Sequence, residues 1–574
     1  MQTRTPMEPL RIITGLVVAA SLTTTAQTLQ WAGKLGGPGA TYASAVAVDA
    51  AGNTLTTGWF DHTSDMDPGP GVANLTVPVG GDFDIHVTKL DAMGGFIWTR
   101  QMGGDGYDYA RAIAVDAAGN VYVAGDFQGT ADFDPGPNTF TLTSAADGSN
   151  DVFVCKLDPG GNFLWARRMG GFGDVRGYGI AVNAAQEVFT TGNFMGTIDF
   201  DPGAGVANVM GAGPDIFVSK LDAAGNYLWA DHMGGPGDDA GQAITLAANG
   251  DVLLTGYFRG TADFDPGPGT FNLVAGGTIG ESDAFVCRLD AAGTLVWAAG
   301  MGGPSREIGY AIAVDDAGAV LTTGSFIGTV DFDPGPGEYL LTEITGVDRD
   351  TYVSKLDGAG QFVWAKQMGG QNFAEALAIA VDQAGSVYTT GWFAETADFD
   401  PGSAVFSLTA GDQTGAFISK LDSQGQFVWA VQIGGAAHTG GAAIAVESNG
   451  TVRATGFFFG TTDLDPGPGV VNVTAPPGVA DSYVLRLSDP STAVGGPRTA
   501  EDALTVFPNP ARGAITVKVN GPLPPDARLR LRNNLGQVMT DAPAQAGTHR
   551  LAEGIAPGLY FVQCGGEAVR VVVE

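Results

Sequence analysis

The chain has 574 residues, of which 88 are glycine and 44% are hydrophobic. This length predicts several domains or one large repeat architecture, and the hydrophobic content is sufficient for large cores. The chain carries 61 acidic and 28 basic residues, a formal net charge of −33, which argues against polyanionic partners such as nucleic acids and anionic membrane surfaces. Three cysteines and five scattered histidines argue against a disulfide framework, a cysteine-rich metal module and a histidine metal cluster.

The first 26 residues have the features of an export signal. Two arginines give a basic start, the run 12–22 is apolar, and Thr24-Thr25-Ala26 is a small-residue cleavage site. We therefore expect residues 1–26 to be a signal peptide and the mature chain to begin at Gln27. The apolar run is shorter than the ~20 residues that a membrane helix needs, and no later stretch approaches that length. The mature protein is expected to be soluble and outside the cytoplasm.

A tryptophan phrase recurs along the chain every 64 to 68 residues. Its tryptophans are Trp31, Trp98, Trp165, Trp229, Trp297, Trp364 and Trp429. Between two such phrases the chain repeats an AIAVD-type run, a turn such as AAGN, a VYVAGDF-type run, DFDPGPG, a short FTLT run and a DVFVCKLD-type run. Runs of four to eight residues that are bounded by Gly, Asn and Asp predict strands joined by tight turns. No segment has helical periodicity.

Each repeat therefore contains four main strands, which is the number that a β-propeller blade requires. We call them first (AIAVD), second (VYVAGDF), third (DVFVCKLD) and fourth (the tryptophan phrase). The seventh set lacks a fourth strand after Leu487, whereas a spare fourth strand, 29–35, opens the mature chain. We therefore predict an all-β, seven-bladed β-propeller over residues 27–489, in which the N-terminal strand completes the last blade and removes an open edge. A two-sheet sandwich array is the alternative, but it does not explain the permuted ends.

The repeats resemble the β-propeller repeat family SBBP, whose units carry a similar AIAVD-x-x-GN-x-Y-x-x-G-x-F core. The resemblance covers roughly residues 27–489. It implies a propeller fold but no particular ligand, because propellers host many different activities.

The loops that join fourth strands to first strands differ between repeats after a shared Gly-Gly. These loops contain Asp105-Gly106-Tyr107-Asp108, Asp174-Val175-Arg176, Pro304-Ser305-Arg306-Glu307, Asn372-Phe373-Ala374-Glu375 and Ala437-His438-Thr439. Blade topology places them on one face together with the loops between second and third strands. Ligand contacts concentrate on variable loops that a rigid scaffold holds, so this is the predicted binding face.

Two charged features recur in every repeat. A basic residue lies in each third strand: Lys89, Lys156, Lys220, Arg288, Lys355, Lys420 and Arg486. A D-x-D pair opens each loop between second and third strands: Asp65/Asp67, Asp132/Asp134, Asp199/Asp201, Asp263/Asp265, Asp331/Asp333, Asp398/Asp400 and Asp463/Asp465. Because one active site does not need seven copies, we interpret both features as architectural, with Asp-Pro-Gly as a turn. The alternative is Ca²⁺ binding by pairs such as Asp132 and Asp134.

No catalytic, cofactor-binding or metal-ligating residue is predicted, and no cofactor. Cys155 and Cys287 hold positions where other third strands have serine, so we interpret them as small packed residues rather than a disulfide. The chain contains neither GxSxG nor HExxH. We therefore predict that the protein is not an enzyme.

The C-terminal part is a separate region. Residues 490–503 are a polar linker with Gly and Pro. Residues 504–574 resemble the type A C-terminal sorting domain of the type IX (Por) secretion system through VFPNPA with Gly513, NLGQV at 534–538 and GIAPGLYFV at 554–562. The resemblance implies a small β-sandwich that carries cargo across the outer membrane, is usually cleaved, and has the translocon and its sorting peptidase as partners. The end at Arg570 and VVVE differs from the lysine-bearing end of many relatives. A small binding sandwich is the alternative.

Three functional classes remain open. The preferred interpretation is a bacterial binding or adhesion module that is secreted or displayed on the outer-membrane surface, with an unknown glycan or protein ligand. The second is a structural surface protein without a discrete ligand. The third is a hydrolase or lyase, because some propellers are enzymes. A binding screen separates the first two, and a turnover that one loop substitution abolishes would support the third.

Overall fold

A computed structural model describes residues 27–488, apart from 146–147, 278–279, 345–347 and 436, together with the strands between 504 and 573. The predicted signal peptide, 1–26, and nearly all of the linker region after Ser488 lie outside the described residues. The chain divides into two compact units, Met1–Thr492 and Ala493–Glu574. The described residues are all-β, with strands and turns but no helix.

Four kinds of strand recur in the first unit, as the repeat predicts. The first strands are β2 (Thr41–Val48), β8 (Tyr109–Val115), β14 (Val175–Val182), β20 (Ala240–Leu246), β26 (Glu307–Val314), β32 (Ala374–Val381) and β36 (Thr439–Val446). The second strands are β3 (Thr54–Phe60), β9 (Val121–Phe127), β15 (Val188–Phe194), β21 (Val252–Arg259), β27 (Val320–Phe326), β33 (Val387–Asp398) and β37 (Val452–Phe459).

The third and fourth strands follow the same order. The third strands are β6 (Asp84–Leu90), β12 (Asp151–Leu157), β18 (Asp215–Leu221), β24 (Ser282–Leu289), β30 (Asp350–Leu356), β34 (Ser407–Leu421) and β40 (Ala480–Ser488). The fourth strands are β7 (Phe96–Gly104), β13 (Phe163–Gly171), β19 (Tyr227–Met233), β25 (Leu295–Met301), β31 (Phe362–Gly370), β35 (Phe427–Ile433) and β1 (Thr28–Leu35).

Short strands lie in the loops between second and third strands. They are β4 (Thr63–Asp65), β5 (Asn74–Thr76), β10 (Thr130–Asp132), β11 (Thr141–Thr143), β16 (Thr197–Asp199), β17 (Asn208–Met210), β22 (Thr261–Asp263), β23 (Asn272–Val274), β28 (Thr329–Asp331), β29 (Leu340–Thr342), β38 (Thr461–Asp463) and β39 (Asn472–Thr474). Each pair is an antiparallel hairpin that begins at the TxD sequence.

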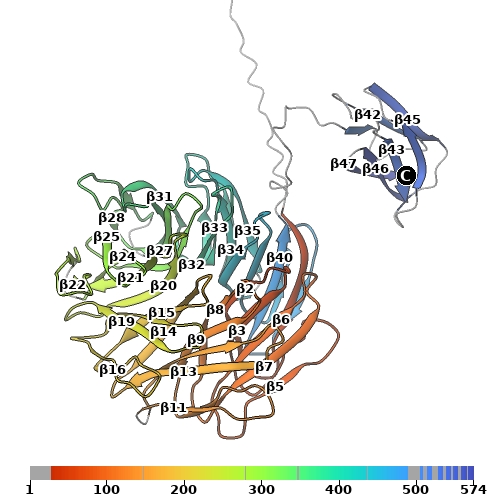
Figure 1. Ribbon diagram of the computed structural model, residues 1–574. Helices are drawn as coiled ribbons and strands as arrows, with labels where there is room; N and C mark the ends of the chain where they lie inside the picture. The colour runs from red at the N-terminus through yellow and green to blue at the C-terminus, as the bar shows by residue number, and fades with distance from the viewer. Residues whose placement is uncertain are drawn as a thin grey trace, which may run out of the picture. The chain divides into compact units, whose positions relative to one another are not determined.

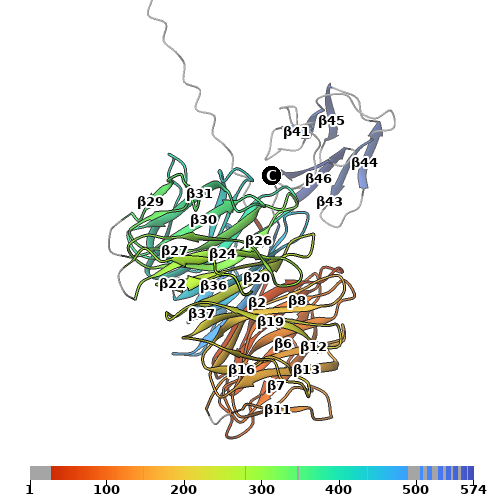
Figure 2. The same ribbon diagram turned by 60° about the vertical axis from the view of Figure 1, so that its left-hand side comes forward.

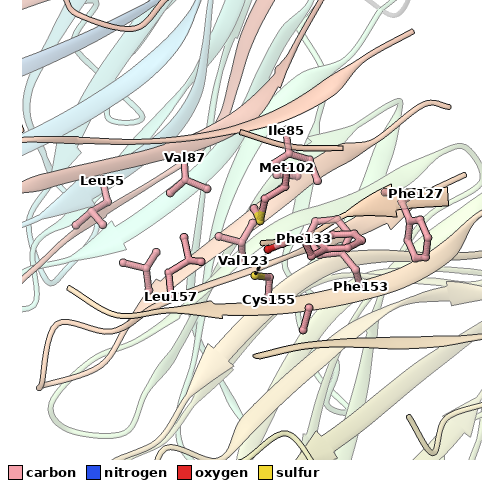
Figure 3. Packing of buried hydrophobic residues seen from close by; sticks show 14 of the residues in the cluster. Leu55, Ile85, Val87, Met102, Val123, Phe127, Phe133, Phe153, Cys155 and Leu157 are labelled. Carbon is pink, nitrogen blue, oxygen red and sulfur yellow. Dashed lines mark hydrogen bonds between the residues drawn. The ribbon is translucent and has the colours of Figure 1, made fainter. Parts of the chain in front are cut away.

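The sheets have a propeller-like arrangement (Figures 1 and 2). First strands of successive sets contact one another in the closed order β2, β8, β14, β20, β26, β32, β36 and again β2. Every main core cluster contains residues of two neighbouring sets. Figure 3 shows one of them, in which Val87 and Met102 of one set pack against Val123 and Cys155 of the next. The cores therefore lie between sheets.

The N-terminal strand pairs with the last third strand, as the sequence predicts. β1 is antiparallel to β40 from Thr28↔Ser488 to Leu35↔Ser482, and Figure 1 shows β40 beside the N-terminal strands. The Ser482 hydroxyl donates to the Thr41 carbonyl at 2.8 Å, and Arg453 Nε donates to Thr54 Oγ1 at 2.9 Å. The last and first sets are therefore in direct contact.

The prediction of seven separate blades is not confirmed. Among the described residues of the first unit, hydrogen bonds group the main strands into six sheets of four to eight strands. The cause is backbone pairing between the Gly-Gly after a fourth strand and the TxD hairpin of the next set, for example Gly103↔Asp132 and Gly369↔Asp398. These pairs add β10 and β11 to the sheet of β7, and they join β31 to β33. Neighbouring sets are thus linked by hydrogen bonds as well as by packing.

In the second unit the described strands form two sheets. β41 (Leu504–Phe507), β42 (Ala514–Val519) and β45 (Gly547–Glu553) form a three-stranded sheet, and β43 (Arg528–Asn533), β44 (Val538–Pro543), β46 (Gly558–Cys564) and β47 (Glu567–Val573) form a four-stranded one. The second unit is therefore β-structured, whereas the β-sandwich itself stays a prediction. Most residues of the sequence phrases that suggested a sorting domain lie outside the described residues.

Candidate functional site

The D-x-D pairs form hydrogen-bonded turns in all seven sets. In the second set, Asp132 Oδ1 accepts the amides of Asp134 at 3.0 Å and Phe140 at 2.8 Å, while Asp134 Oδ1 accepts the amide of Gly136 at 2.8 Å. The other six pairs make the same three contacts with similar distances. Backbone capture by Asp is the behaviour of a turn residue, so these contacts favour the architectural interpretation over Ca²⁺ binding at the D-x-D pairs.

The basic residues of the third strands have acidic or aromatic partners in their own sets. Lys89 Nζ lies 2.9 Å from Asp49, and six of the seven form such ion pairs with the turn between first and second strands. The ammonium group of Lys156 instead lies 4.9 Å from the centre of the Tyr122 ring and donates to Gln186 Oε1 at 3.0 Å. These side chains hold turns in place, which again agrees with an architectural role.

Cys155 and Cys287 are buried free thiols, as predicted. They lie in β12 and β24, which belong to different sheets, and burial raises the pKa of both thiols. A protonated, buried thiol is a packing residue rather than a nucleophile. Burial also lowers the pKa of His86 to about 4, so this imidazole is neutral inside the first set.

A group of aromatic side chains lies along the inner ring of strands, at the end where the variable loops begin. This inner aromatic cluster consists of Tyr42, Trp59, Phe83, Tyr107, Tyr109, Phe373, Trp392 and Phe457. Tyr42 and Trp59 are stacked with ring centres 4.5 Å apart, and Phe457 lies 5.5 Å from Tyr42. Trp392 lies 5.9 Å from Phe457. The cluster thus extends continuously over the sixth, seventh, first and second sets.

The inner aromatic cluster is open to solvent in part. Tyr107 is 39% exposed, and the other members are half-buried. Burial raises the pKa of Tyr42 and Tyr109, so their hydroxyls stay protonated and can donate hydrogen bonds. Half-buried rings with a polar atom at one edge suit ligands that present a flat or ring-shaped apolar face together with hydroxyl groups.

Each end of the cluster has a guanidinium and a carboxylate. At one end, the Arg111 guanidinium lies 5.2 Å from the centre of the Tyr109 ring and 5.3 Å from that of Tyr178, and it pairs with Asp126. At the other end, Glu375 pairs with Arg349 at 2.8 Å and accepts from the Trp392 indole at 2.9 Å. Charged groups in these fixed positions can orient a polar ligand above the rings.

A β-bulge in each first strand positions part of this site. In β8 the register shifts between Ala110 and Ala112, so Arg111 is an extra residue on that strand. Bulges re-aim side chains and are frequent beside functional sites. The equivalent extra residues include Tyr178 and Tyr310, which follow Gly177 and Gly309 at the same shift.

The variable loops that were predicted to form the binding face contribute only some of the residues of the inner aromatic cluster. Tyr107 and Phe373 come from these loops, and Glu375, which was expected in a loop, is the second residue of β32. Tyr42, Trp59, Tyr109, Trp392 and Phe457 belong to first and second strands, Phe83 precedes a third strand, and none of these six was predicted. One signal could have found the members in second strands. The sixth position of each second-strand phrase varies although it lies between a glycine and a phenylalanine that all seven repeats share, and it holds Trp59, Asp126, Asn193, Tyr257, Ser325, Trp392 and Phe457.

Among the described residues, no group of three or more His, Cys, Asp or Glu side chains is arranged to hold a metal ion. Within the same part of the chain, no helix has the length and apolar character needed to cross a membrane.

The fold and the sequence repeat define a β-propeller-like repeat protein. Residues 97–126 match the family described as SBBP, beta-propeller repeat, which agrees with the resemblance noted from the sequence. The match covers the fourth strand of one set and the first and second strands of the next.

Two curated relatives are similar to this chain. An uncharacterized WD repeat-containing protein, L264, of Acanthamoeba polyphaga mimivirus is 23% identical over 507 residues, covering 75% of this chain and 36% of the relative. The regulatory protein FlaEY of Caulobacter vibrioides is 26% identical over 205 residues, covering 33% of this chain and 21% of the relative. The chain thus spans about a third and about a fifth of the lengths of these two relatives.

Solved structures give distant similarities. A fungal alcohol oxidase of the AA5 family in complex with copper is 13% identical, with a TM-score of 0.35, covering 94% of this chain and 99% of that structure. A Bacteroides caccae protein of unknown function is 10% identical with a TM-score of 0.30, covering 62% and 91%. PorZ, a surface component of the type IX secretion system of Porphyromonas gingivalis, is 12% identical with a TM-score of 0.17, covering 95% and 100%.

Proposed function

We propose that this protein is an exported, non-catalytic binding module that holds an extracellular glycan at the inner aromatic cluster. The observation that carries the proposal is the continuous row of half-buried rings with a paired guanidinium and carboxylate at each end. Sugar rings have apolar faces and polar edges, and these match aromatic faces beside fixed hydrogen-bonding groups. The net charge of −33 disfavours nucleic acids as ligands.

A glycan screen on the full-length protein tests this function. Trp59→Ala and Trp392→Ala should each weaken the binding of a glycan that the screen identifies by about tenfold. A tenfold loss of affinity corresponds to about 1.4 kcal/mol of lost stacking and burial. Titration followed by tryptophan fluorescence measures the affinity. Phe172→Ala is the matched control, because Phe172 is an exposed aromatic, 94% accessible, outside the cluster, and it should leave the affinity unchanged. Equal affinity of all four proteins would contradict the assignment of the site.

A protein ligand at the same cluster is the second candidate. A protein array on the same samples separates it from the glycan, and the same two tryptophan variants apply. A structural surface protein without a discrete ligand is the remaining alternative, and it is favoured by the seven identical turns and the seven anchored basic side chains. That alternative predicts no saturable binding in either screen.

Delivery of the binding module is assigned to the second unit. We propose that residues 504–574 form a type A sorting domain of the type IX secretion system, recognised by the translocon and its sorting peptidase, so that the protein reaches the outer surface of a bacterium or its medium. Support comes from the ordered phrases VFPNPA, NLGQV and GIAPGLYFV and from the export signal at residues 1–26. The two described sheets of the second unit are compatible with the β-sandwich that this domain type implies.

Truncation tests the delivery proposal. Removal of residues 504–574 should leave the first unit folded, because the two units have separate contacts, but should retain it in the periplasm of the native host. As the sufficiency control, residues 493–574 fused behind a periplasmic reporter should carry that reporter to the cell surface. Normal surface delivery of the truncated chain, measured by protease accessibility of whole cells, would contradict the proposal.

A further inference from the structure

A buried aspartate is the first or second residue of the third strand in six of the seven sets. These residues are Asp84, Asp151, Asp215, Asp283, Asp350 and Asp481, and none is more than 5% exposed. A buried carboxylate is unfavourable unless a cation or several hydrogen bonds compensate its charge. The six sets therefore allow a comparison of how the same buried charge is compensated within one protein.

Two of these aspartates have a cationic side chain from the adjacent fourth strand. Asp481 lies 2.8 Å from Lys34 Nζ, and Asp151 lies 2.5 Å from Arg168 Nε. Lys34 and Arg168 occupy equivalent positions in their fourth strands. Each pairs with the third-strand residue that follows the aspartate by two positions. At the equivalent position opposite Asp84 the chain has the neutral Gln101.

Three of the aspartates are instead next to a second buried acid. Asp84, Asp215 and Asp283 are close to Asp108, Asp239 and Glu307, which end the following variable loops. In the first pair, Asp84 Oδ1 and Asp108 Oδ2 both lie within 3.0 Å of the position that a Cβ atom on Gly103 would occupy. In the second, Asp215 Oδ1 and Asp239 Oδ2 have the same relation to Gly234. The carboxylates of these two pairs thus face one another across a glycine. In the third pair, Asp283 lies against the equivalent Gly302, and Glu307 Oε2 accepts the amide of Gly303 at 3.0 Å.

These pairs contain acceptor atoms without partners. Asp84 Oδ1 and Asp283 Oδ1 are buried and receive no hydrogen bond from any described residue. Burial and the neighbouring carboxylate raise the pKa of Asp108 and of Glu307 to about 8, and of Asp239 to about 7. Asp151 Oδ1, in the set that contains Arg168, is also without a hydrogen bond, so the difference between the sets is the charge. Each pair brings two carboxyl groups together without the lysine or arginine that Asp481 and Asp151 have.

We propose that each of the pairs Asp84–Asp108, Asp215–Asp239 and Asp283–Glu307 binds a calcium ion. Ca²⁺ takes six to eight oxygen ligands and favours carboxylates, loop carbonyls and water in flexible geometry. Two carboxylates supply part of that set, and water and backbone carbonyls would supply the rest. The ion performs the role that Lys34 and Arg168 have in their sets. With two carboxylates the affinity should be that of extracellular modules, with Kd on the order of 10⁻⁴–10⁻³ M.

Calorimetric titration of the full-length protein at pH 7.5 tests the proposal. Wild-type protein should bind three calcium ions. Gln101→Arg, which gives the first pair the cation that Asp151 has, should bind two, and so should Asp108→Asn. The Asp132→Asn, Asp134→Asn double variant alters a D-x-D turn and should still bind three. If the wild type shows no saturable calcium binding, or if Gln101→Arg and Asp108→Asn keep the wild-type stoichiometry, the proposal is wrong.

Thermal melting separates calcium from a shared proton. The raised carboxyl pKa values mean that the folded state binds more protons than the unfolded state between about pH 4 and pH 8, so Tm in EDTA should fall as the pH rises through this range. Other charged groups lie near these carboxyls. Asp126, which is near Asp108, forms an ion pair with Arg111, and His232 faces Asp215 in the second pair. Calcium should raise Tm at pH 8 and have little effect at pH 5, where protons occupy the carboxyls.

Two comparisons complete the melting experiment. Gln101→Arg should raise Tm at pH 8 in EDTA and should reduce the increment that calcium gives. Gln101→Lys, which introduces the cation that Lys34 provides in its set, is the second variant if the arginine substitution does not fold. A calcium increment at pH 8 that the same concentration of Mg²⁺ reproduces would be ionic screening and would overturn the proposal.

Discussion

Deletion of residues 27–36 should destabilise the first unit by more than the ~3–5 kcal/mol that truncation of one large core aromatic costs. β1 pairs with β40 along its whole length. Its Leu35 is fully buried in a cluster with Phe60 and Leu90 of the first set. Deletion also removes Lys34, and the buried Asp481 then has no cation, which by itself costs several kcal/mol. The Tm of the deleted chain, measured by circular dichroism or calorimetry, should therefore be far below that of the full chain.

Two controls make this result specific to strand pairing. Gln30→Ala changes an exposed side chain of the same strand and should leave Tm nearly unchanged. A synthetic peptide of residues 27–36, added in excess, should restore part of the lost Tm by occupying the edge of β40. If the deleted protein melts like the intact one, β1 does not close the arrangement in solution.

The repeat in the sequence was sufficient to predict the strands and the position of β1. A missing fourth strand after Leu487 and a spare one at 29–35 could be matched by counting alone, and the β1–β40 pairing agrees. The merging of sets into larger sheets could not be predicted in this way. It depends on two-residue backbone pairs such as Gly103↔Asp132, which leave no hydrophobic pattern and form only when two loops of different repeats meet in space.

Only part of the candidate site could be predicted from the sequence, because the site combines residues of different repeats. The variable loops indicated the same face as the inner aromatic cluster and contained Tyr107 and Phe373. Trp59 and Trp392 lie within strand phrases, where an aromatic residue is an ordinary strand former. That they belong to one cluster follows from ring closure, which places the sixth and seventh sets beside the first. The buried carboxylate pairs were missed for the same reason, since Asp84 and Asp108 belong to different repeats.

Gly125→Ala should be among the most destabilising single substitutions in the protein, at about 3 kcal/mol or more. Gly125 is the fifth residue of the VYVAGDF phrase and lies opposite the bulge of β8. A Cβ atom there would overlap the carbonyl oxygen of Tyr109. Equivalent glycines in the other six sets make the same approach to their first strands: Gly58, Gly192, Gly256, Gly324, Gly391 and Gly456. Their backbone conformation is an ordinary one, so the penalty is steric rather than conformational.

Gly300→Ala is the matched control for this substitution. Gly300 also lies in a strand with an ordinary backbone conformation, but the nearest atoms to its Cβ position are 3.6 Å or more away. Alanine fits there, and the reduced freedom of the unfolded chain should stabilise the protein by about 0.4–1 kcal/mol. Urea unfolding of both variants measures the two free energies. Because the bulge opposite Gly125 positions Arg111 between Tyr109 and Tyr178, Gly125→Ala should also weaken ligand binding at the inner aromatic cluster, whereas Gly300→Ala should not. Similar unfolding free energies for the two variants would show that the bulge tolerates a side chain and does not fix the geometry of the site.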